Sequence, residues 1–324
     1  MQSTLRTICI LAFVLCCSMA LTAATAEHAV FVRVAVIYIA PDSTSARLAT
    51  ADRGREAAIL EKSNEWAHVI VTLPPAANTP AQPLEEPQPR SVTGWVLGKG
   101  LVTVNTPNGD QVMFGEAVDS ESEASRRGGR RGAAADARRL YARTAEYFPN
   151  SPLAAEAAYR AADIQWQLDK SDQETRPSAR SRDPRERLPI NEEAMRQVEK
   201  KYRGTKWADL AAFHLIENKL CGDWAAQSKC PEKEAEVYEK YVQDHPNSPA
   251  AAEALYHAAY RYAALIEIYK VEGNANKAHG AAQRAVATAQ RISGKNPSAD
   301  WNARAQRLIY MVQNNIPVYG SNLE

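Results

Sequence analysis

A cysteine and a histidine lie close enough in the sequence to suggest thiol chemistry. Cys221 and His214 are seven residues apart, and on one helix they would share a face, as a thiol nucleophile and its general base must. Cys230 competes for the same thiol, because two cysteines with eight residues between them are typical of a local disulfide. No turn typical of a nucleophile accompanies Cys221. We therefore predict a Cys221–Cys230 disulfide, with two free thiols as the alternative.

The sequence motifs of the common enzyme classes are absent. The chain contains neither His-Glu-x-x-His nor Gly-x-Ser-x-Gly, and it has no glycine-rich loop of the kind that holds a phosphate. Its six histidines are scattered, and no set of His and Cys has the spacing of metal ligands. We therefore predict a protein without catalytic residues, without a metal and without a cofactor.

Aromatic and arginine side chains are better candidates, and they suggest binding rather than catalysis. Arg261 and Tyr262 lie outside the positions that this helix shares with the other copy of a repeat, and His257 lies on the same helix. Tyr and Arg favour interfaces because each joins a large area to a polar end. We predict that these three residues line a groove. Trp95 or Tyr38 would line a second, peptide-binding groove, unless the tryptophans of that region fill the core of a small domain.

The helices that must position these residues belong to a repeat written twice. Residues 147–159 read Tyr-Phe-Pro-Asn-Ser-Pro-Leu-Ala-Ala-Glu-Ala-Ala-Tyr, and residues 244–256 read Asp-His-Pro-Asn-Ser-Pro-Ala-Ala-Ala-Glu-Ala-Leu-Tyr. A helix end, a turn with capping residues beside a proline and an alanine-rich helix indicate stacked helix pairs. A degenerate copy lies at 202–214, after an arginine-rich segment at 171–188 that we expect to be a disordered insertion. The helical domain is predicted over 135–316.

The two repeat strings resemble tetratricopeptide-type repeats. The matching pattern, at 141–159 and 238–256, is Tyr-x-x-x-x-x-x-Phe/His-Pro-Asn-Ser-Pro-x-Ala-Ala-Glu-Ala-x-Tyr. It is most similar to the repeats of exported envelope proteins such as the outer-membrane assembly lipoprotein BamD and the cell-division coordinator paired with the Tol-Pal system. The resemblance implies an all-α helical solenoid with an adaptor role, and it assigns no functional residue.

Residues 27–104 have the composition of short strands and tight turns. A small all-β barrel is typical of so many short strands in so few residues. A proline-rich insertion at 74–90 separates the third strand from the fourth; it is either a disordered hairpin tip or a polyproline segment offered to a partner. Five segments rich in β-branched and aromatic residues indicate the strands: 30–38, 57–61, 66–71, 94–97 and 100–104.

The same region resembles a bacterial SH3-type domain. Members of that family often bind cell-wall peptides, and many act as spacers, so the resemblance implies the fold and leaves the ligand open. The fold class predicted for the whole chain is thus multidomain, with a small all-β SH3-like barrel and an all-α tetratricopeptide-like solenoid. Four segments carry the resemblance: Val34-x-x-x-Tyr38-Ile39-x-Pro41-Asp42, Arg53-Gly54, Asn64-Glu65-Trp66-Ala67-His68-Val69 and Gly94-Trp95-Val96.

The first 26 residues have the features of an export signal. Arg6 precedes an apolar run at 8–21, and Ala24-Thr25-Ala26 offers a cleavage site. The run is short for a membrane span, so an uncleaved or lipidated anchor is the alternative to cleavage. An exported protein of the periplasm or the cell envelope is predicted, in a compartment where a disulfide persists.

Residues 105–134 are predicted to be a flexible linker, acidic at 116–123 and basic at 126–132. The chain has 39 Lys and Arg against 38 Asp and Glu, a balance that gives no general attraction to nucleic acid. Only the basic cluster at 126–132 would support peripheral contact with a membrane. No oligomeric state is predicted.

The function predicted from the sequence is that of a non-enzymatic exported adaptor. It would bind an envelope protein or a peptidoglycan peptide through the repeat groove and the barrel. One alternative is a self-associating structural module in which the barrel is a spacer. A cell-wall peptidase is the remote alternative, and it would need the Cys221 thiol.

Overall fold

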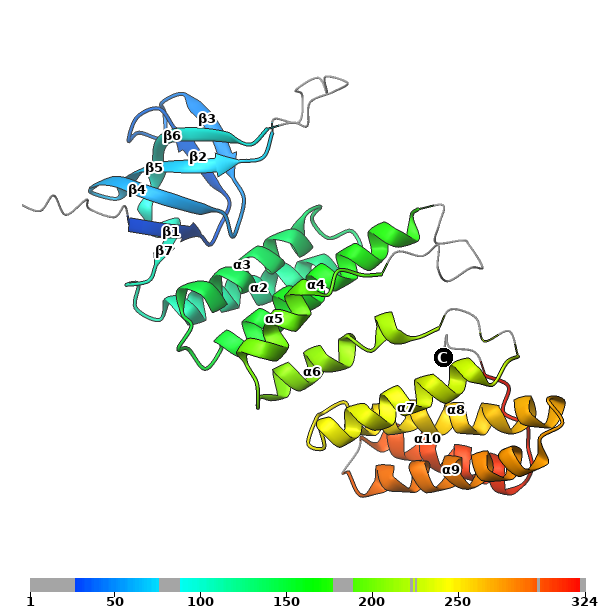
Figure 1. The fold of residues 1–324 in the computed structure, drawn as a ribbon. Helices are drawn as coiled ribbons and strands as arrows, with labels where there is room; N and C mark the ends of the chain where they lie inside the picture. The colour runs from blue at the N-terminus through cyan, green and yellow to red at the C-terminus, as the bar shows by residue number, and fades with distance from the viewer. Residues whose placement is uncertain are drawn as a thin grey trace, which may run out of the picture. The chain divides into compact units, whose positions relative to one another are not determined.

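The computed structural model describes residues 27–75, 88–176, 189–221, 224, 226–295 and 298–320. The chain divides into two compact units, of which the first comprises Met1–Ala51 and Arg55–Thr103 and the second comprises Asp52–Gly54 and Val104–Glu324. The first, the sheet unit, is built of strands, and the second, the helical unit, is built of helices (Figure 1). The chain is therefore a mixed strand-and-helix multidomain protein, as the sequence predicts.

The described part of the sheet unit forms one antiparallel sheet of seven strands. The strands pair in the order β3-β2-β6-β5-β4-β1-β7. Among the described residues no pairing joins β3 to β7, so the sheet is not closed and the prediction of a barrel is wrong in this respect. The strands are β1 (Glu27–Phe31), β2 (Ala35–Tyr38), β3 (Arg47–Ala51), β4 (Glu56–Ser63), β5 (Trp66–Leu73), β6 (Arg90–Leu97) and β7 (Leu101–Thr103), with a short 3₁₀ helix η1 (Gly98–Gly100) before β7.

Two differences from the predicted strands have clear physical reasons. The predicted strand 30–38 divides into β1 and β2, because β1 pairs with β4 and β7 while β2 pairs with β3 and β6. Strand β3 has no counterpart in the prediction. It pairs only with β2, and of its side chains only that of Ala51 is buried, so its sequence carries no apolar alternation.

The proline-rich insertion connects β5 to β6, as predicted. Leu73 and Arg90 are paired at the ends of these two strands. Residues 76–87 of the insertion lie outside the described residues, so both interpretations of this segment stay predictions.

One face of the sheet forms an apolar core, which follows from the alternation of side chains along each strand. Among its members, Phe31, Ile37, Val69 and Val96 are fully buried. Because successive side chains point to opposite faces, the residues next to these core members lie on the other face of the sheet, which we call the outer face; beside Phe31 that face is also buried, at Val30 and Val32. The core consists of Ala29, Phe31, Ile37, Ala51, Ala57, Ile59, Ala67, Val69, Val71, Leu73 and Val96.

In the helical unit, helices that follow one another in sequence pack side by side along most of the chain. None of the described helices is both long enough and apolar enough to cross a membrane. The helices are α2 (Gly109–Ser125), α3 (Ala133–Tyr147), α4 (Ala154–Glu174), α5 (Glu193–Lys201), α6 (Lys206–His214), the 3₁₀ helix η4 (Glu217–Lys219), α7 (Lys229–Asp244), α8 (Ala251–Val271), α9 (Ala275–Ser293) and α10 (Ala299–Gln313).

Helix α2 occupies most of the segment predicted to be a flexible linker, so that prediction is wrong for 109–125. Met113, Ala117 and Ser120 recur at helical spacing and are fully buried, and α2 packs on α3. Their spacing is typical of one face of a helix, but the acidic residues between them make this periodicity hard to recognise in the sequence. The prediction of a disordered insertion is also wrong for 171–174, because α4 continues to Glu174; residues 177–188 lie outside the described residues, so for them it stays a prediction.

The two Pro-Asn-Ser-Pro turns join their helices in the same way. In the first, Ser151 N donates to Phe148 O at 3.0 Å, and Ser151 Oγ accepts from Leu153 N at 3.1 Å. In the second, Ser248 N donates to His245 O at 3.2 Å, and Ser248 Oγ accepts from Ala250 N at 3.1 Å. The serine therefore organises each turn, and α3–α4 and α7–α8 are equivalent helix pairs.

Candidate functional site

The first candidate site is a group of aromatic rings on the sheet unit. Tyr38 and Trp95, the two binding residues predicted there, are direct partners on β2 and β6. Strand β5 contributes His68, which stacks on Trp95 with centroids 4.8 Å apart, and Trp66, which meets the Tyr38 ring edge-on at 5.7 Å. We call these four residues the aromatic cluster. The structure thus brings the two predicted residues together and adds two that were not predicted to bind.

The aromatic cluster lies on the outer face of the sheet. Trp66 and His68 alternate with the buried Ala67 and Val69 of β5, and Trp95 precedes the buried Val96 of β6. All four rings are half-buried. The alternative prediction, that the tryptophans fill the core, is therefore wrong: neither Trp66 nor Trp95 belongs to it.

A glycine beside Trp95 allows β2 and β6 to approach closely enough to form this cluster. A Cβ atom at Gly94 would lie 2.6 Å from the carbonyl oxygen of Tyr38 and 2.7 Å from a methyl group of Ile37. Any larger residue would push the strands apart. The resulting surface offers flat apolar rings with polar edges, on which a peptide, a proline ring or another planar group can stack.

On the helical unit, Arg261 does not face a groove, contrary to the prediction. Only 1% of Arg261 is exposed, and its Nε donates to Glu234 Oε2 at 2.7 Å; Glu234 is itself fully buried. The Glu234 carboxylate also accepts from the backbone N of Cys221 at 2.7 Å and from Trp224 Nε1 at 3.2 Å. A buried charge needs partners of this kind. Arg261 therefore ties α8 to α7 and to the cysteine loop, and it is a structural residue.

His257 lies on the same face of α8 as Arg261, among aromatic rings. It stacks on Tyr238 of α7 with centroids 5.1 Å apart, and it also contacts the ring of Trp301 on α10. Its Nδ1 is buried without a hydrogen bond in the described structure. The structure therefore separates Tyr262 from His257 and Arg261, because residues 257 and 261 are four apart and share a face of the helix, whereas 262 lies about 100° around the helix from 261.

Cys221 and Cys230 form a disulfide, as predicted, with their Cα atoms 6.0 Å apart. The Cys221 sulfur is therefore bonded to another sulfur and does not pair with His214. The His214 ring is engaged instead with the Tyr159 hydroxyl, 3.0 Å from its Nε2. In the described part of the chain, no three His, Cys, Asp or Glu side chains are placed to hold a metal.

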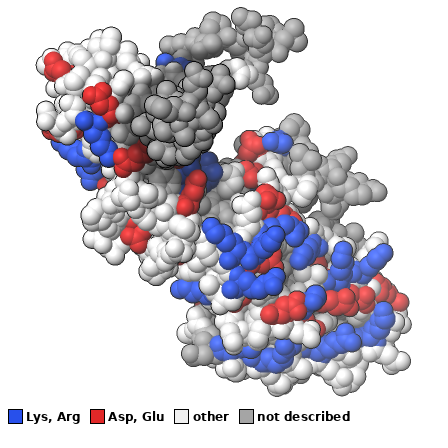
Figure 2. Space-filling model, turned by 60° about the vertical axis from the view of Figure 1, so that its left-hand side comes forward, with Lys and Arg blue, Asp and Glu red and all other residues white. Residues whose placement is uncertain are grey.

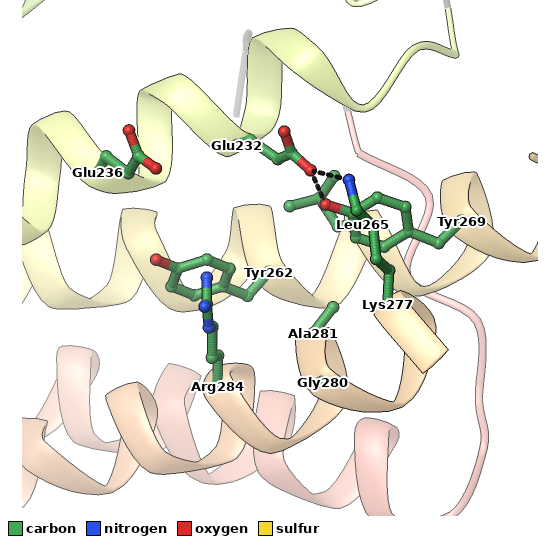
Figure 3. Close-up of a pocket in the computed structure, with 9 residues that line it drawn as sticks. All are labelled: Glu232, Glu236, Tyr262, Leu265, Tyr269, Lys277, Gly280, Ala281 and Arg284. Carbon is green, nitrogen blue, oxygen red and sulfur yellow. Dashed lines mark hydrogen bonds and ion pairs between the residues drawn. The ribbon is translucent and has the colours of Figure 1, made fainter. Parts of the chain in front are cut away.

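Tyr262 does line a groove, the second candidate site. This groove has a volume of about 310 Å³ and lies between α7 and α9, over α8 (Figure 3). Its floor is buried and its rims are charged, acidic on α7 and basic on α9. We call it the charged groove. It is lined by Glu232 and Glu236 of α7, by Tyr262, Leu265 and Tyr269 of α8, and by Lys277, Gly280, Ala281 and Arg284 of α9.

Interactions between α7 and the other helices close both ends of the charged groove. At one end, Glu232 accepts from the Tyr269 hydroxyl and pairs with Lys277 at 3.4 Å. At the other end, Glu239 accepts from the Tyr262 hydroxyl at 3.0 Å and pairs with Arg291 at 3.5 Å. Burial, followed by the charge of Glu239, raises the pKa of Tyr262 to about 12. This hydroxyl therefore stays protonated and remains a donor at neutral pH.

Between these two ends, Glu236 and Arg284 lie on opposite walls (Figure 3). The Arg284 guanidinium lies over the Tyr262 ring, 5.7 Å from its centroid. Both side chains are exposed, and among the described residues no ion pair joins Glu236 to Arg284. On the face drawn in Figure 2, acidic side chains form a band with Lys and Arg on either side, at the height of the C-terminal helices in Figure 1.

Sequence reasoning missed the charged residues of this groove, although part of their signal is visible. Glu232, Glu236 and Glu239 recur at the spacing of one face of α7. Lys277, Arg284 and Arg291 recur every seven residues along α9, which also places them on one face. What the sequence does not indicate is that these two faces border the same groove.

A third feature, the alanine groove, occupies the corresponding place in the first repeat. It has a volume of about 370 Å³ and lies between α3, α4 and α5. The buried hydroxyl of Tyr202, at its edge, has no hydrogen bond among the described residues. Most of its lining is small and apolar: Ala142, Ala145, Ala158, Ala161, Ala162, Ala194 and Val198.

No model of a known protein family matches the chain, and no curated protein matches it. Among solved structures, it is similar to the de novo designed helical repeat protein DHR64, with 17% identity over 64% of this chain and 94% of that one. It is also similar to a chain described as "DHF58 filament", with 16% identity over 63% of this chain and 91% of that one. The TM-score is 0.22 in both cases, which is too low to support any inference about function.

Proposed function

We propose that this chain is an exported, non-enzymatic adaptor of the cell envelope. Its sheet unit, an SH3-like domain, would hold a peptidoglycan peptide on the aromatic cluster. Its helical unit, a tetratricopeptide-like array, would hold an envelope protein. The observation that carries the proposal is the gathering of Tyr38, Trp66, His68 and Trp95 on the outer face of the sheet.

The position of the aromatic cluster supports a binding role, because the fold does not need these rings in its core. Aliphatic side chains and Phe31 already fill the buried face of the sheet. Half-buried aromatic rings on the opposite face keep apolar area in water, and surfaces of this kind are enriched at protein interfaces. Aromatic residues also contribute a large share of the binding energy where they are found at interfaces.

Two compact units on one chain support the adaptor role. A ligand held by each unit is tethered to the other, which raises its effective concentration without any new contact. The export signal predicted at 1–26 and the Cys221–Cys230 disulfide support a compartment outside the cytoplasm.

Retention on purified cell wall tests the proposal. We expect the full chain to sediment with the wall, and we expect Trp95→Ala to weaken retention about tenfold or more, because it removes the ring that stacks on His68. Tyr310→Ala is the matched control, since it removes an aromatic ring that is 62% exposed on α10. Circular dichroism would establish that both variants are folded.

Two outcomes would contradict the proposal. Equal wall retention by Trp95→Ala and the unsubstituted chain would remove the aromatic cluster as the binding surface. A stable oligomer in light scattering, without any wall retention, would favour a self-associating module in which the sheet unit is a spacer.

A further inference from the structure

The charged groove is built to hold charges of both signs. Its acidic wall is α7 and its basic wall is α9, and ion pairs between these walls close its two ends at 3.4 Å and 3.5 Å. Each end also engages a tyrosine hydroxyl, that of Tyr269 at one end and that of Tyr262 at the other. The walls are therefore fixed in position before any ligand arrives, which lowers the entropy lost on binding.

The centre of the groove also has an acidic and a basic side chain, but among the described residues no ion pair joins the two. Glu236 projects from α7, and Arg284 projects from α9 over the Tyr262 ring (Figure 3). Beneath them, Leu265 and Ala281 form a buried apolar floor. A cavity of about 310 Å³ lies between these residues. This volume is at the lower end of the range for ligand pockets, so the groove admits individual side chains and not a folded element.

We propose that the charged groove binds a segment of a partner protein that inserts one acidic and one basic side chain. The partner's carboxylate would pair with Arg284, and the partner's ammonium or guanidinium group would pair with Glu236. The aliphatic parts of both inserted side chains would cover Leu265 and Ala281. The proposal rests on the adaptor role of the helical unit and names the chemistry of its partner.

Charge complementarity selects a partner segment with both signs over one with a single sign. A phosphate or an acidic segment would meet Arg284 but would also approach the carboxylates of Glu232 and Glu236. A purely basic segment would meet Glu236 but would be repelled by Lys277 and Arg284. A segment with both charges avoids both repulsions, and such mismatches are a main source of specificity at interfaces.

Peptide titrations followed by NMR test this inference. The probes are capped alanine-glutamine peptides with one Glu and one Lys separated by one, two or three residues, together with matched peptides in which Gln replaces one charge or both. The reporter is the backbone amide of Gly280, which lines the groove. We expect saturable shifts with at least one mixed-charge peptide, and weaker binding by about two- to fivefold when either peptide charge is replaced.

Variants of the two wall residues then assign each contact. In Arg284→Gln, replacing the peptide's Glu should cause no further loss, whereas replacing its Lys still should; Glu236→Gln should give the converse pattern. Both residues are exposed, so we expect both variants to fold, which circular dichroism would check. Arg307→Gln, an exposed substitution on α10 outside the groove, is the control and should bind like the unsubstituted chain.

Two results would overturn the inference: no Gly280 shift with any mixed-charge peptide at millimolar concentration, or equal binding of the peptide that carries no charge. Either result would leave wall retention by the sheet unit unaffected, so the adaptor proposal would stand without this partner assignment. Loss of wall retention with intact peptide binding would contradict the wall-binding role of the sheet unit and would leave the partner assignment of the charged groove standing.

Discussion

The two Pro-Asn-Ser-Pro repeats have the same turn but different chemistry around it. In both, the serine N–H caps the preceding helix and the serine hydroxyl accepts from the N–H two residues later. The second partner of that hydroxyl differs. Ser151 donates to Asp110 of α2 at 2.6 Å, whereas Ser248 lies 2.5 Å from the buried hydroxyl of Tyr241. The turn therefore fixes how two helices are joined and leaves open what surrounds them.

The same contrast holds for the buried charge of each repeat. Asp136 of α3 is paired with Arg130 and Arg139, both of which reach water. Glu234 of α7 is paired with Arg261, and neither side chain is more than 1% exposed. The grooves differ accordingly, since the first repeat has an alanine-lined groove and the second has the charged groove. The comparison shows that residues outside the shared pattern determine what each repeat can bind.

Alkaline pH should have the largest effect on both repeats, because each contains buried tyrosines. Burial raises the pKa of Tyr238 and Tyr262 to about 12 from the ordinary 10.0, and it also raises the pKa of Tyr141, Tyr159 and Tyr241. The folded state keeps these groups neutral, whereas the unfolded chain ionises them near pH 10. Their contribution to stability is thus complete below pH 10 and is lost as the pH rises toward 12.

Phenolate absorbance and helical circular dichroism, recorded together against pH, would check this prediction. We expect a late group of tyrosines to ionise together with the loss of helix. If all 13 tyrosines titrated near pH 10 while the helices stayed intact, the buried hydroxyls would not be held as the structure places them.

Substitution of the buried arginine should separate the two repeats most clearly. Arg261→Leu leaves the Glu234 carboxylate buried without its ion partner, so we expect the free energy of unfolding to fall by about 3–5 kcal/mol. The matched change in the first repeat, Arg130→Leu, leaves Asp136 paired with Arg139 and should cost about 1 kcal/mol. Urea unfolding followed by helical circular dichroism measures both. Equal losses would mean that the two buried carboxylates have equivalent surroundings, contrary to the comparison above.

The smallest expected difference concerns the shared serine. Ser248→Ala removes a partner of the buried Tyr241 hydroxyl and should lower the free energy of unfolding by about 1–2 kcal/mol. Ser151→Ala breaks a contact to the half-buried Asp110 carboxylate and should cost about 0.5–1 kcal/mol. Thermal unfolding of the two variants under the same conditions compares them directly. A larger loss at Ser151 would reverse the order that burial implies.

Several elements could be predicted from the sequence because their signals are local. The Pro-Asn-Ser-Pro turns and the two cysteines act over fewer than a dozen residues, and both are found where expected. Residue type alone singles out Tyr38 and Trp95 as candidates, and the structure places them side by side. Their partners Trp66 and His68 could not be predicted as a cluster, because only the register of β5 on β6 places His68 opposite Trp95.

Helix α8 shows why the remaining candidates could not be sorted from the sequence. It packs against α7, α9 and α10, and buried residues occur on all its sides. A helix of this kind has no single apolar stripe. Arg261 and Tyr262 therefore look alike in the sequence, yet a rotation of one residue, about 100° around the helix, directs Arg261 to Glu234 and Tyr262 to the charged groove.

Features that depend on short-range geometry can be predicted from the sequence of this protein: strands followed by helices, two equivalent turns and a local disulfide. Which charges are buried and which border a groove follows only from the packing of the helices. The reason is physical, because the burial of a side chain depends on helices far away in the sequence. Glu236 and Arg284 face each other only because α7 and α9 both pack on α8.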